Sequence, residues 1–239
     1  MAIYKIKLKS RHEVASGTMA FHFEKPSGFS FLAGQCGDFT LPNPPQNDAE
    51  GNKRSFTLAS APYENDLIIT TRMRDTAFKR SLKLIELGTE FDLDAPWGEL
   101  TLHDDPHTPA VFLTGGIGIT PVRSIVLQAT HVQLPHRIFA FYSNRTPKDA
   151  AFLDELNAAQ KSNPNFTLIA TMTETGPSDA WKGETGYIDK AMLKRHLSDL
   201  RKPIYYVSGP PEMVNAMQKL LKDIGVEEDN IRGEEFSGY

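Results

Sequence analysis

The chain has 239 residues, which is enough for one large domain or two of ordinary size, and its apolar content of 40% supports substantial cores. A single cysteine, Cys36, excludes an intramolecular disulfide and every zinc or iron–sulfur site that needs two or more thiolates from this chain. The net charge of -4 and the dispersal of Lys and Arg among acids favour small-molecule or protein partners over nucleic acid.

The N-terminal residues alternate apolar side chains with lysines, which is typical of a strand and not of a signal peptide. The longest apolar stretch, AVFLTGGIGITPV, is interrupted by glycines and is shorter than the roughly 20 residues of a spanning helix. We therefore expect a cytoplasmic protein without a transmembrane segment.

The first part of the chain consists of short strand-like segments separated by turn residues, which is typical of an antiparallel barrel or sandwich. The predicted strands cover residues 3–10, 18–25, 35–42, 54–60, 66–73, 90–96 and 99–103. Apolar residues at helical spacing predict one helix over residues 76–88, and HDDPHTP (103–109) predicts a linker.

From Ala110 onward, apolar runs alternate with polar turns and helical segments, which predicts a doubly wound parallel sheet of five strands. The predicted strands cover residues 110–114, 137–143, 166–172, 204–209 and 230–236. The predicted helices cover residues 121–130, 149–161, 191–200 and 211–224. We therefore predict two domains, an antiparallel β-barrel over residues 1–104 and an α/β domain over residues 105–239.

A glycine-rich turn, TGGIGITP, follows the first predicted parallel strand. Its glycines permit a sharp turn and the close approach of a ligand, and the helix N-terminus behind it favours a pyrophosphate. Thr120 and Pro121 predict the start of that helix, with Thr120 as its cap. The alternative is a turn that serves packing only.

The barrel segment KRSFTLAS places Arg54 and Phe56 on one face of a strand, with Ser55 and Thr57 on the other. Arginine can neutralise a phosphate, an aromatic ring can lie on a planar ring, and the region near Thr57 can bond a ring nitrogen. The alternative is an ordinary barrel strand with a surface arginine and a core phenylalanine.

Four cations surround the start of the barrel helix in RMRDTAFKRS: Arg72, Arg74, Lys79 and Arg80. Asp75 or Thr76 is the predicted N-cap. Cations beside free helix N–H groups form a second anion site, and the alternative is a solvated basic turn. Two anion sites in two domains indicate a chain that binds two dinucleotides.

Four ordered motifs, RSFT, TGGIGITP, VSGPPEMV and the closing EEF, resemble those of the ferredoxin–NADP reductase superfamily. The similarity covers essentially the whole chain. It implies an FAD-binding antiparallel barrel joined to an NAD(P)-binding α/β domain. The implied activity is that of an FAD-dependent NAD(P)H oxidoreductase, in which hydride passes from the nicotinamide C4 to flavin N5.

The resemblance implies that Arg54 contacts the FAD pyrophosphate and that Thr57 lies near flavin N5. Phe56 stands where the family has tyrosine, which keeps stacking but loses the phenol hydrogen bond, and Lys79 stands where a Ser or Thr is usual. The implied FAD contacts are Arg54, Ser55, Phe56, Thr57, Thr71, Arg72, Met73, Ala77, Phe78 and Lys79.

In the second domain, Ser208 replaces the cysteine of the family's Cys-Gly-Pro turn, so Thr57 and Ser208 are the candidate catalytic residues. Ser143 and Arg145, with no acid between them, favour NADPH, while the nearby Asp149 keeps NADH open. The implied coenzyme contacts are Gly115, Gly116, Gly118, Thr120, Pro121, Ser143, Arg145, Ser208, Gly209, Pro210 and Met213.

The closing EEFSGY offers Phe236 or Tyr239 as a cover for one flavin face, and the alternative is a frayed tail. Glu235 is either a proton donor to the flavin or an exposed strand-end carboxylate.

We expect the electron acceptor to be a redox protein, such as a ferredoxin, a flavodoxin or an oxygenase component, or a diffusible acceptor. No metal site is expected. The alternative function is an FAD-holding electron-relay subunit of a larger complex that does not use NAD(P)H directly, and a third is a nucleotide-binding protein without flavin. The intact TGGIGITP turn favours the reductase.

Overall fold

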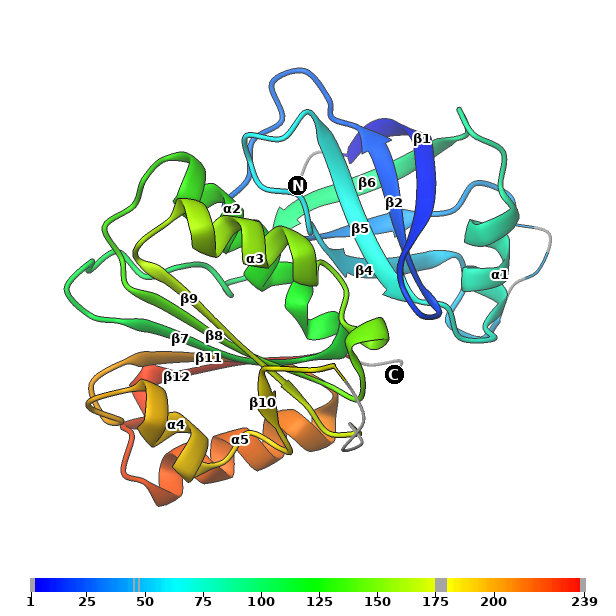
Figure 1. Cartoon of the computed structure of the whole chain (residues 1–239). Helices are drawn as coiled ribbons and strands as arrows, with labels where there is room; N and C mark the ends of the chain where they lie inside the picture. Colours follow the sequence, from blue (N-terminus) through cyan, green and yellow to red (C-terminus); the bar gives the residue numbers. More distant parts are fainter. Residues whose placement is uncertain (1–2, 45, 47, 175–179, 237–239) are drawn as a thin grey trace.

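The computed structural model describes residues 3–44, 46, 48–174 and 180–236. Figure 1 shows an antiparallel sheet domain beside a parallel sheet that carries helices on both faces. Within the described part of the chain, no helix is both long and apolar enough to cross a membrane.

The first domain is a six-stranded antiparallel sheet with the order β4-β3-β6-β1-β2-β5 and one helix. Its elements are β1 (Ile3–Ala15), β2 (Thr18–Glu24), β3 (Cys36–Thr40), β4 (Lys53–Thr57), β5 (Asp66–Arg72), α1 (Ala77–Leu84) and β6 (Glu90–Trp97). The curled sheet leaves β4 and β5 as its two ends, and both strands line one cavity.

Period-two patterning explains the interior of this domain. On β2, Phe21 and Phe23 are fully buried while His22 between them is half-buried. Phe23 packs edge to face on Phe91 of β6, with ring centroids 5.0 Å apart. Thr76 caps α1 by accepting a hydrogen bond from the Lys79 backbone N–H. Of the two predicted caps, Asp75 and Thr76, the structure thus selects Thr76.

The second domain is a parallel sheet with the order β10-β9-β8-β7-β11-β12. Its strands are β7 (Ala110–Gly115), β8 (Ile138–Asn144), β9 (Phe166–Met172), β10 (Glu184–Thr185), β11 (Ile204–Gly209) and β12 (Ile231–Glu235). Its helices are α2 (Ile119–His131), α3 (Leu153–Ser162), α4 (Lys190–His196) and α5 (Pro211–Asp223). The five predicted strands are confirmed, and the two-residue β10 is a sixth.

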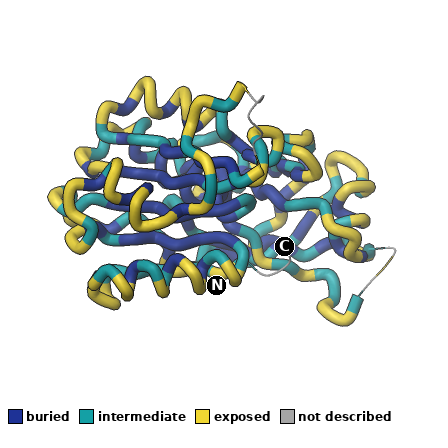
Figure 2. The backbone as a smooth tube through the Cα atoms, turned by 60° about the horizontal axis from the view of Figure 1, so that its bottom comes forward, coloured by how far each residue is buried: buried dark blue, intermediate teal, exposed yellow. Residues whose placement is uncertain are grey.

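Helices cover both faces of the parallel sheet, with α2 and α3 on one face and α4 and α5 on the other (Figure 1). Burial on both faces explains why β7 and β8 are almost wholly apolar. Figure 2 shows long buried segments in the interior and exposed residues in the outer turns. The carboxyl ends of the strands meet at one edge of the sheet, where doubly wound folds bind ligands.

Two predictions about local structure were wrong. Residues 99–103 form no strand, because Leu100 and Leu102 pack against the core under α2 and the His103 N–H donates to the Tyr206 hydroxyl at 2.9 Å. The segment therefore belongs to the connection between the sheets. Thr120 is not a helix cap: α2 begins at Ile119 after a short 3-10 turn, and the Thr120 hydroxyl donates to the Ile117 carbonyl at 3.1 Å.

Candidate functional site

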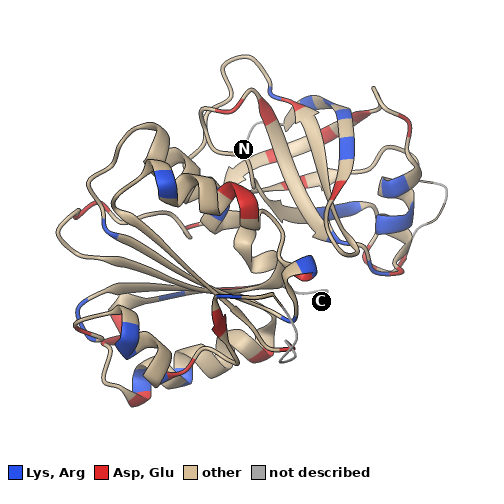
Figure 3. Cartoon of the chain, in the orientation of Figure 1, with Lys and Arg blue, Asp and Glu red and all other residues tan. Residues whose placement is uncertain are grey.

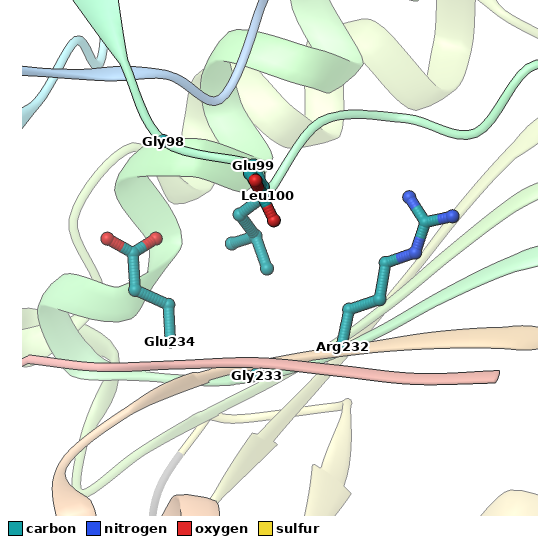
Figure 4. Close-up of a pocket in the computed structure, with 6 residues that line it drawn as sticks. All are labelled: Gly98, Glu99, Leu100, Arg232, Gly233 and Glu234. Carbon is teal, nitrogen blue, oxygen red and sulfur yellow. The ribbon is translucent and has the colours of Figure 1, made fainter. Parts of the chain in front are cut away.

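Three cavities lie where the domains meet. The barrel cavity, about 460 Å³, is lined by β4, β5 and α1 together with Ile117, Thr120 and Phe236. The sheet-edge cavity, about 630 Å³, lies at the carboxyl ends of β7, β8 and β9. The rear cavity, about 680 Å³, lies between residues 98–100 and 232–234 (Figure 4).

The barrel cavity gathers positive charge. Figure 3 shows basic residues on and around α1, and the cavity is lined by five cations against the single acid Glu50. The five are Lys53, Arg54, Arg72, Arg74 and Lys79. Burial, and then the charges of Arg74 and Arg54, lower the pKa of Lys79 to about 8. Like charges held together in a partly buried site favour an anionic ligand.

Arg54 is fixed in place before any ligand enters. Its guanidinium pairs with Asp48 at 2.7 Å and Glu50 at 3.0 Å, and it lies over the Phe78 ring with 5.1 Å to the centroid. The hydrogen bond from Arg54 lowers the pKa of the Asp48 carboxyl. A phosphate in this cavity therefore meets an oriented guanidinium, and it must compete with two carboxylates for it.

The barrel cavity also offers aromatic surface and an unsatisfied hydroxyl. Phe56 of β4 and Phe78 of α1 line it from the first domain, and Phe236, which follows β12, lines it from the second. Thr70 lines the same cavity, and its buried hydroxyl has no hydrogen-bond partner within the described residues. A buried hydroxyl left unpaired is costly, which points to a polar ligand atom at this position.

Thr57 connects the barrel cavity to the C-terminal strand. The Cys36 thiol lies 3.8 Å from the Thr57 hydroxyl and 3.4 Å from a carboxylate oxygen of Glu234 on β12. Burial raises the pKa of Cys36 to about 12, so the one thiol of the chain is protonated at neutral pH and is no nucleophile. Burial also raises the pKa of Glu234.

The sheet-edge cavity combines backbone from the glycine turn with side chains from several strand ends. Asn144 lines it, and the buried Asn144 amide nitrogen has no hydrogen-bond partner among the described residues. Arg72 and Arg74 line both this cavity and the barrel cavity, so the two cavities are adjacent.

The turn Gly115–Gly118 is tightly packed. A Cβ at Gly118 would overlap the Ser208 carbonyl, and one at Gly115 would overlap the Met213 sulfur. Ser208 is fully buried, and its hydroxyl donates to the Gly118 carbonyl at 2.9 Å and contacts the Thr114 hydroxyl at 3.2 Å. Ser208 thus holds the glycine turn against the end of β11.

The structure brings most of the predicted site residues to the two cavities. Those lining the barrel cavity are Arg54, Ser55, Phe56, Thr57, Thr71, Arg72, Phe78, Lys79, Thr120 and Phe236. Those lining the sheet-edge cavity are Arg72, Gly115, Gly116, Ser143, Arg145, Pro210 and Met213. Six others are not among the lining residues of either cavity: Met73, Ala77, Gly118, Pro121, Ser208 and Gly209. Tyr239 lies outside the described residues.

Sequence reasoning missed several lining residues of the sheet-edge cavity. Glu174 follows the carboxyl end of β9, and Tyr187 follows β10 with 80% of its surface exposed. The signal for Glu174 was present, because every strand end at a doubly wound sheet edge is a candidate ligand contact. Nothing in the sequence placed Tyr187 beside β9, since β10 itself was not predicted.

Comparison with known proteins adds to this geometry. Residues 112–219 match the family model described as the oxidoreductase NAD-binding domain. In fold, the chain is similar to a ferredoxin NADP+ reductase from Neisseria gonorrhoeae with bound FAD and NADP (TM-score 0.80, 20% identity, 98% of each chain). It is also similar to the flavohem-like FAD/NAD binding domain of nitric oxide dioxygenase from Vibrio cholerae (TM-score 0.82, 16% identity, 97% of this chain and 98% of that one). The chain therefore has the two-domain fold of these proteins, and its second domain matches the NAD-binding family model.

Curated relatives match about four fifths of this chain. One subunit of the Na(+)-translocating NADH-quinone reductase of Serratia proteamaculans is 30% identical over 207 residues, which is 79% of this chain and 50% of the relative. The corresponding protein of Idiomarina loihiensis is 28% identical over 200 residues, which is 77% of this chain and 49% of that relative. The chain therefore spans about half the length of the curated relatives it matches.

Proposed function

We propose that this chain is an FAD-dependent NADH oxidoreductase, with FAD in the barrel cavity and the coenzyme in the sheet-edge cavity. The observation that carries the proposal is the pair of adjacent cavities that share Arg72 and Arg74. Each is prepared for a dinucleotide, the first by its cations and the second by the glycine turn at a helix N-terminus.

The residues of the barrel cavity fit FAD. Arg54, Arg72 and Lys79 supply positive charge for a diphosphate, and Phe56 supplies a ring for stacking. The unpaired Thr70 hydroxyl offers a hydrogen bond to a ring or ribitol atom. Thr57, held by its contact with Cys36, is the residue we assign to the flavin N5 region.

When bound, the two cofactors would supply the redox chemistry, which is transfer of a hydride (two electrons and one proton) from nicotinamide C4 to flavin N5. The chain binds and orients both partners. Gly115 and Gly116 of the glycine turn would place protein backbone beside the coenzyme, and Ser208 fixes that turn through the Gly118 carbonyl. Phe236 shields the barrel cavity from the side of the second domain.

The acids of the sheet-edge cavity support NADH over NADPH, although Ser143 and Arg145 alone favour the phosphorylated coenzyme. Glu174 and Asp149 both line this cavity beside Arg145. A carboxylate there can accept hydrogen bonds from ribose hydroxyls, and it repels a 2′-phosphate. Tyr187 adds an exposed ring for the adenine.

The electron acceptor would be a redox protein or a diffusible acceptor. The names of the curated relatives, as subunits of an NADH-quinone reductase, support a protein or quinone acceptor and a place in a complex. The complete glycine turn and the lined sheet-edge cavity support direct use of NADH over a relay subunit that takes electrons from elsewhere.

The test is a rapid-mixing experiment on the FAD-reconstituted protein without oxygen. The proposal predicts that NADH bleaches the flavin absorbance in a single phase that saturates with NADH, and that NADPH does so at least about tenfold less efficiently, the loss expected for one repulsive charge contact. A protein that binds no FAD, or whose bound FAD neither coenzyme reduces, contradicts the proposal. Faster reduction by NADPH contradicts the assignment of Glu174.

A further inference from the structure

The barrel and the α/β domain are fastened together along one side of α2. The Ser124 hydroxyl donates to the Ser60 carbonyl at 2.7 Å, and the Tyr63 ring stacks on His131 with centroids 4.0 Å apart. Gly34 packs on the same helix, where its N–H donates to the Ser124 hydroxyl at 3.3 Å. All these barrel residues lie in the loops that precede β3 and follow β4.

Arg123 is the centre of this contact. Its side chain is 5% exposed and donates to the Ala59 carbonyl at 2.8 Å and to both carboxylate oxygens of Glu64, at 2.8 and 3.1 Å. On its own domain it pairs with Glu155 of α3 at 2.7 Å and lies over the Phe152 ring, 4.9 Å from the centroid. The planar fork of a guanidinium can make these contacts together, whereas an ammonium group cannot.

Arg123 and its partner Ala59 are close in the chain to residues that line the barrel cavity. Ala59 lies two residues after Thr57, and Arg123 lies three residues after Thr120. Thr57 and Thr120 come from different domains, yet both line the barrel cavity. The buried ion pair therefore joins the chain segment that follows Thr57 to the helix that contains Thr120. Both segments lie next to residues that line the barrel cavity, one from each domain.

A buried ion pair of this kind is poorly explained by stability alone. Apolar residues of similar volume are often as stabilising as a buried salt bridge, because removing two charges from water is costly. What the pair provides is a fixed geometry, since neither Arg123 nor Glu64 can move without leaving a charge unpaired. Hydride transfer depends steeply on that kind of geometry.

We propose that Arg123 is a positioning residue that sets the distance between the barrel cavity and the glycine turn through Ala59 and Glu64. This rests on the proposed function, because the distance matters where hydride crosses from one cavity to the other. Glu155 binds the same guanidinium within one domain, so it has no part in setting that distance.

The experiment compares Arg123→Lys and Glu64→Gln with Glu155→Gln as the matched control, since all three alter the same ion-pair network. Rapid mixing of the FAD-loaded variants with NADH yields the limiting rate of flavin reduction and the apparent dissociation constant of NADH. We expect the limiting rate to fall about tenfold or more in the first two variants, with a change of about twofold or less in the dissociation constant. The Glu155→Gln variant should stay within about twofold of the wild type in both values.

A second measurement needs neither cofactor. Backbone hydrogen exchange of the FAD-free proteins should be faster at residues 58–60 and 122–126 in Glu64→Gln, and unchanged there in Glu155→Gln. Folded Arg123→Lys and Glu64→Gln variants that reduce flavin at the wild-type rate, or that exchange like the wild type, overturn the inference. A wild-type protein that NADH cannot reduce overturns the proposed function instead, and the exchange comparison still decides the role of the ion pair.

Discussion

The barrel cavity and the sheet-edge cavity prepare for the same chemical feature, a diphosphate, by different means. The barrel cavity uses side-chain charge, with five cations against Glu50. The sheet-edge cavity uses backbone from the glycine turn and mixes Arg72, Arg74 and Arg145 with three acids, Asp149, Glu174 and Glu212. A large excess of charge suits a ligand that stays bound, and a balanced cavity suits one that enters and leaves.

This difference predicts which substitutions weaken ligand binding in each cavity. A cavity built on side chains should tolerate the loss of any one cation with a graded drop in affinity. A cavity built on backbone contacts should fail abruptly when one Cβ is added, because the packed interior behind it cannot move. Four substitutions or conditions test the contrast, in order of expected effect.

Gly118→Ala should be the most damaging change, because its Cβ would overlap the Ser208 carbonyl and displace the glycine turn. We expect the rate of flavin reduction by NADH to fall roughly 100-fold, as for a misplacement of about 1 Å, while the FAD content remains. Rapid mixing and the flavin spectrum measure both values. Gly233→Ala is the control, since the nearest atom to its Cβ is the end of the flexible Gln218 side chain. Equal rates for the two variants would refute the role of the turn.

Arg54→Ala should weaken FAD binding roughly 10- to 100-fold, which corresponds to a charge-assisted hydrogen bond of about 1.5–3 kcal/mol. The variant also leaves Asp48 and Glu50 without their partner beside the cavity. Titration of the FAD-free protein with FAD, followed by fluorescence, gives the dissociation constant. Arg80→Ala, which removes an exposed cation outside the cavity lining, should bind FAD like the wild type. A tight Arg54→Ala complex would remove Arg54 from the site.

Glu174→Gln should raise the dissociation constant of NADH about tenfold, because one charge-assisted hydrogen bond to the ribose weakens. The same change should improve NADPH binding, since the repulsion of its 2′-phosphate is removed. Reduction rates measured over a range of both coenzymes report this. Glu212→Gln alters a different acid of the same cavity and should leave the coenzyme preference unchanged. Weaker binding of both coenzymes by Glu174→Gln would contradict the assignment.

The smallest effect should come from pH. Lys79 has a pKa of about 8 without ligand, and a nearby diphosphate would raise it because the charged form is then favoured. FAD binding is therefore strongest below pH 8, where Lys79 is already protonated, and should weaken several-fold as the pH rises above 8. Titrations at pH 7 and pH 9 measure the change, and Lys79→Met should abolish it. An equal pH step in the Lys79→Met protein would assign the effect to another group.

Much of the fold followed from local patterns. The alternation on β2 predicts burial of one face, and the apolar runs of β7 and β8 predict burial of both faces. Thr76 was one of the two predicted caps of the barrel helix, and it caps α1. Residues 99–103 misled because alternating Leu100 and Leu102 look like a strand, but they bury against the second domain. Alternation shows that one face is buried and does not show what buries it.

Site residues could be predicted where they lie together in one sequence motif. They could not be predicted where the cavity is lined by several separate segments. Arg54 to Thr57 and the glycine turn are contiguous and could be read from the sequence. Thr70 lines the barrel cavity through the pairing of β5 in the first sheet, and Glu174 and Tyr187 line the sheet-edge cavity because they follow the neighbouring strands β9 and β10. Ser208 was named as a candidate catalytic residue, and the structure shows its buried hydroxyl bonded to the Gly118 carbonyl. Its catalytic role stays a prediction.

The most direct test of the central claim is single-turnover reduction of the bound FAD with NADH that carries deuterium at one or the other C4 position. Direct hydride transfer between the two cavities predicts that one label slows the bleaching of the flavin and that the other leaves it unchanged, because a fixed site presents one face of the nicotinamide to N5. Bleaching at the unlabelled rate with both labels, or no bleaching with NADH at all, would contradict it.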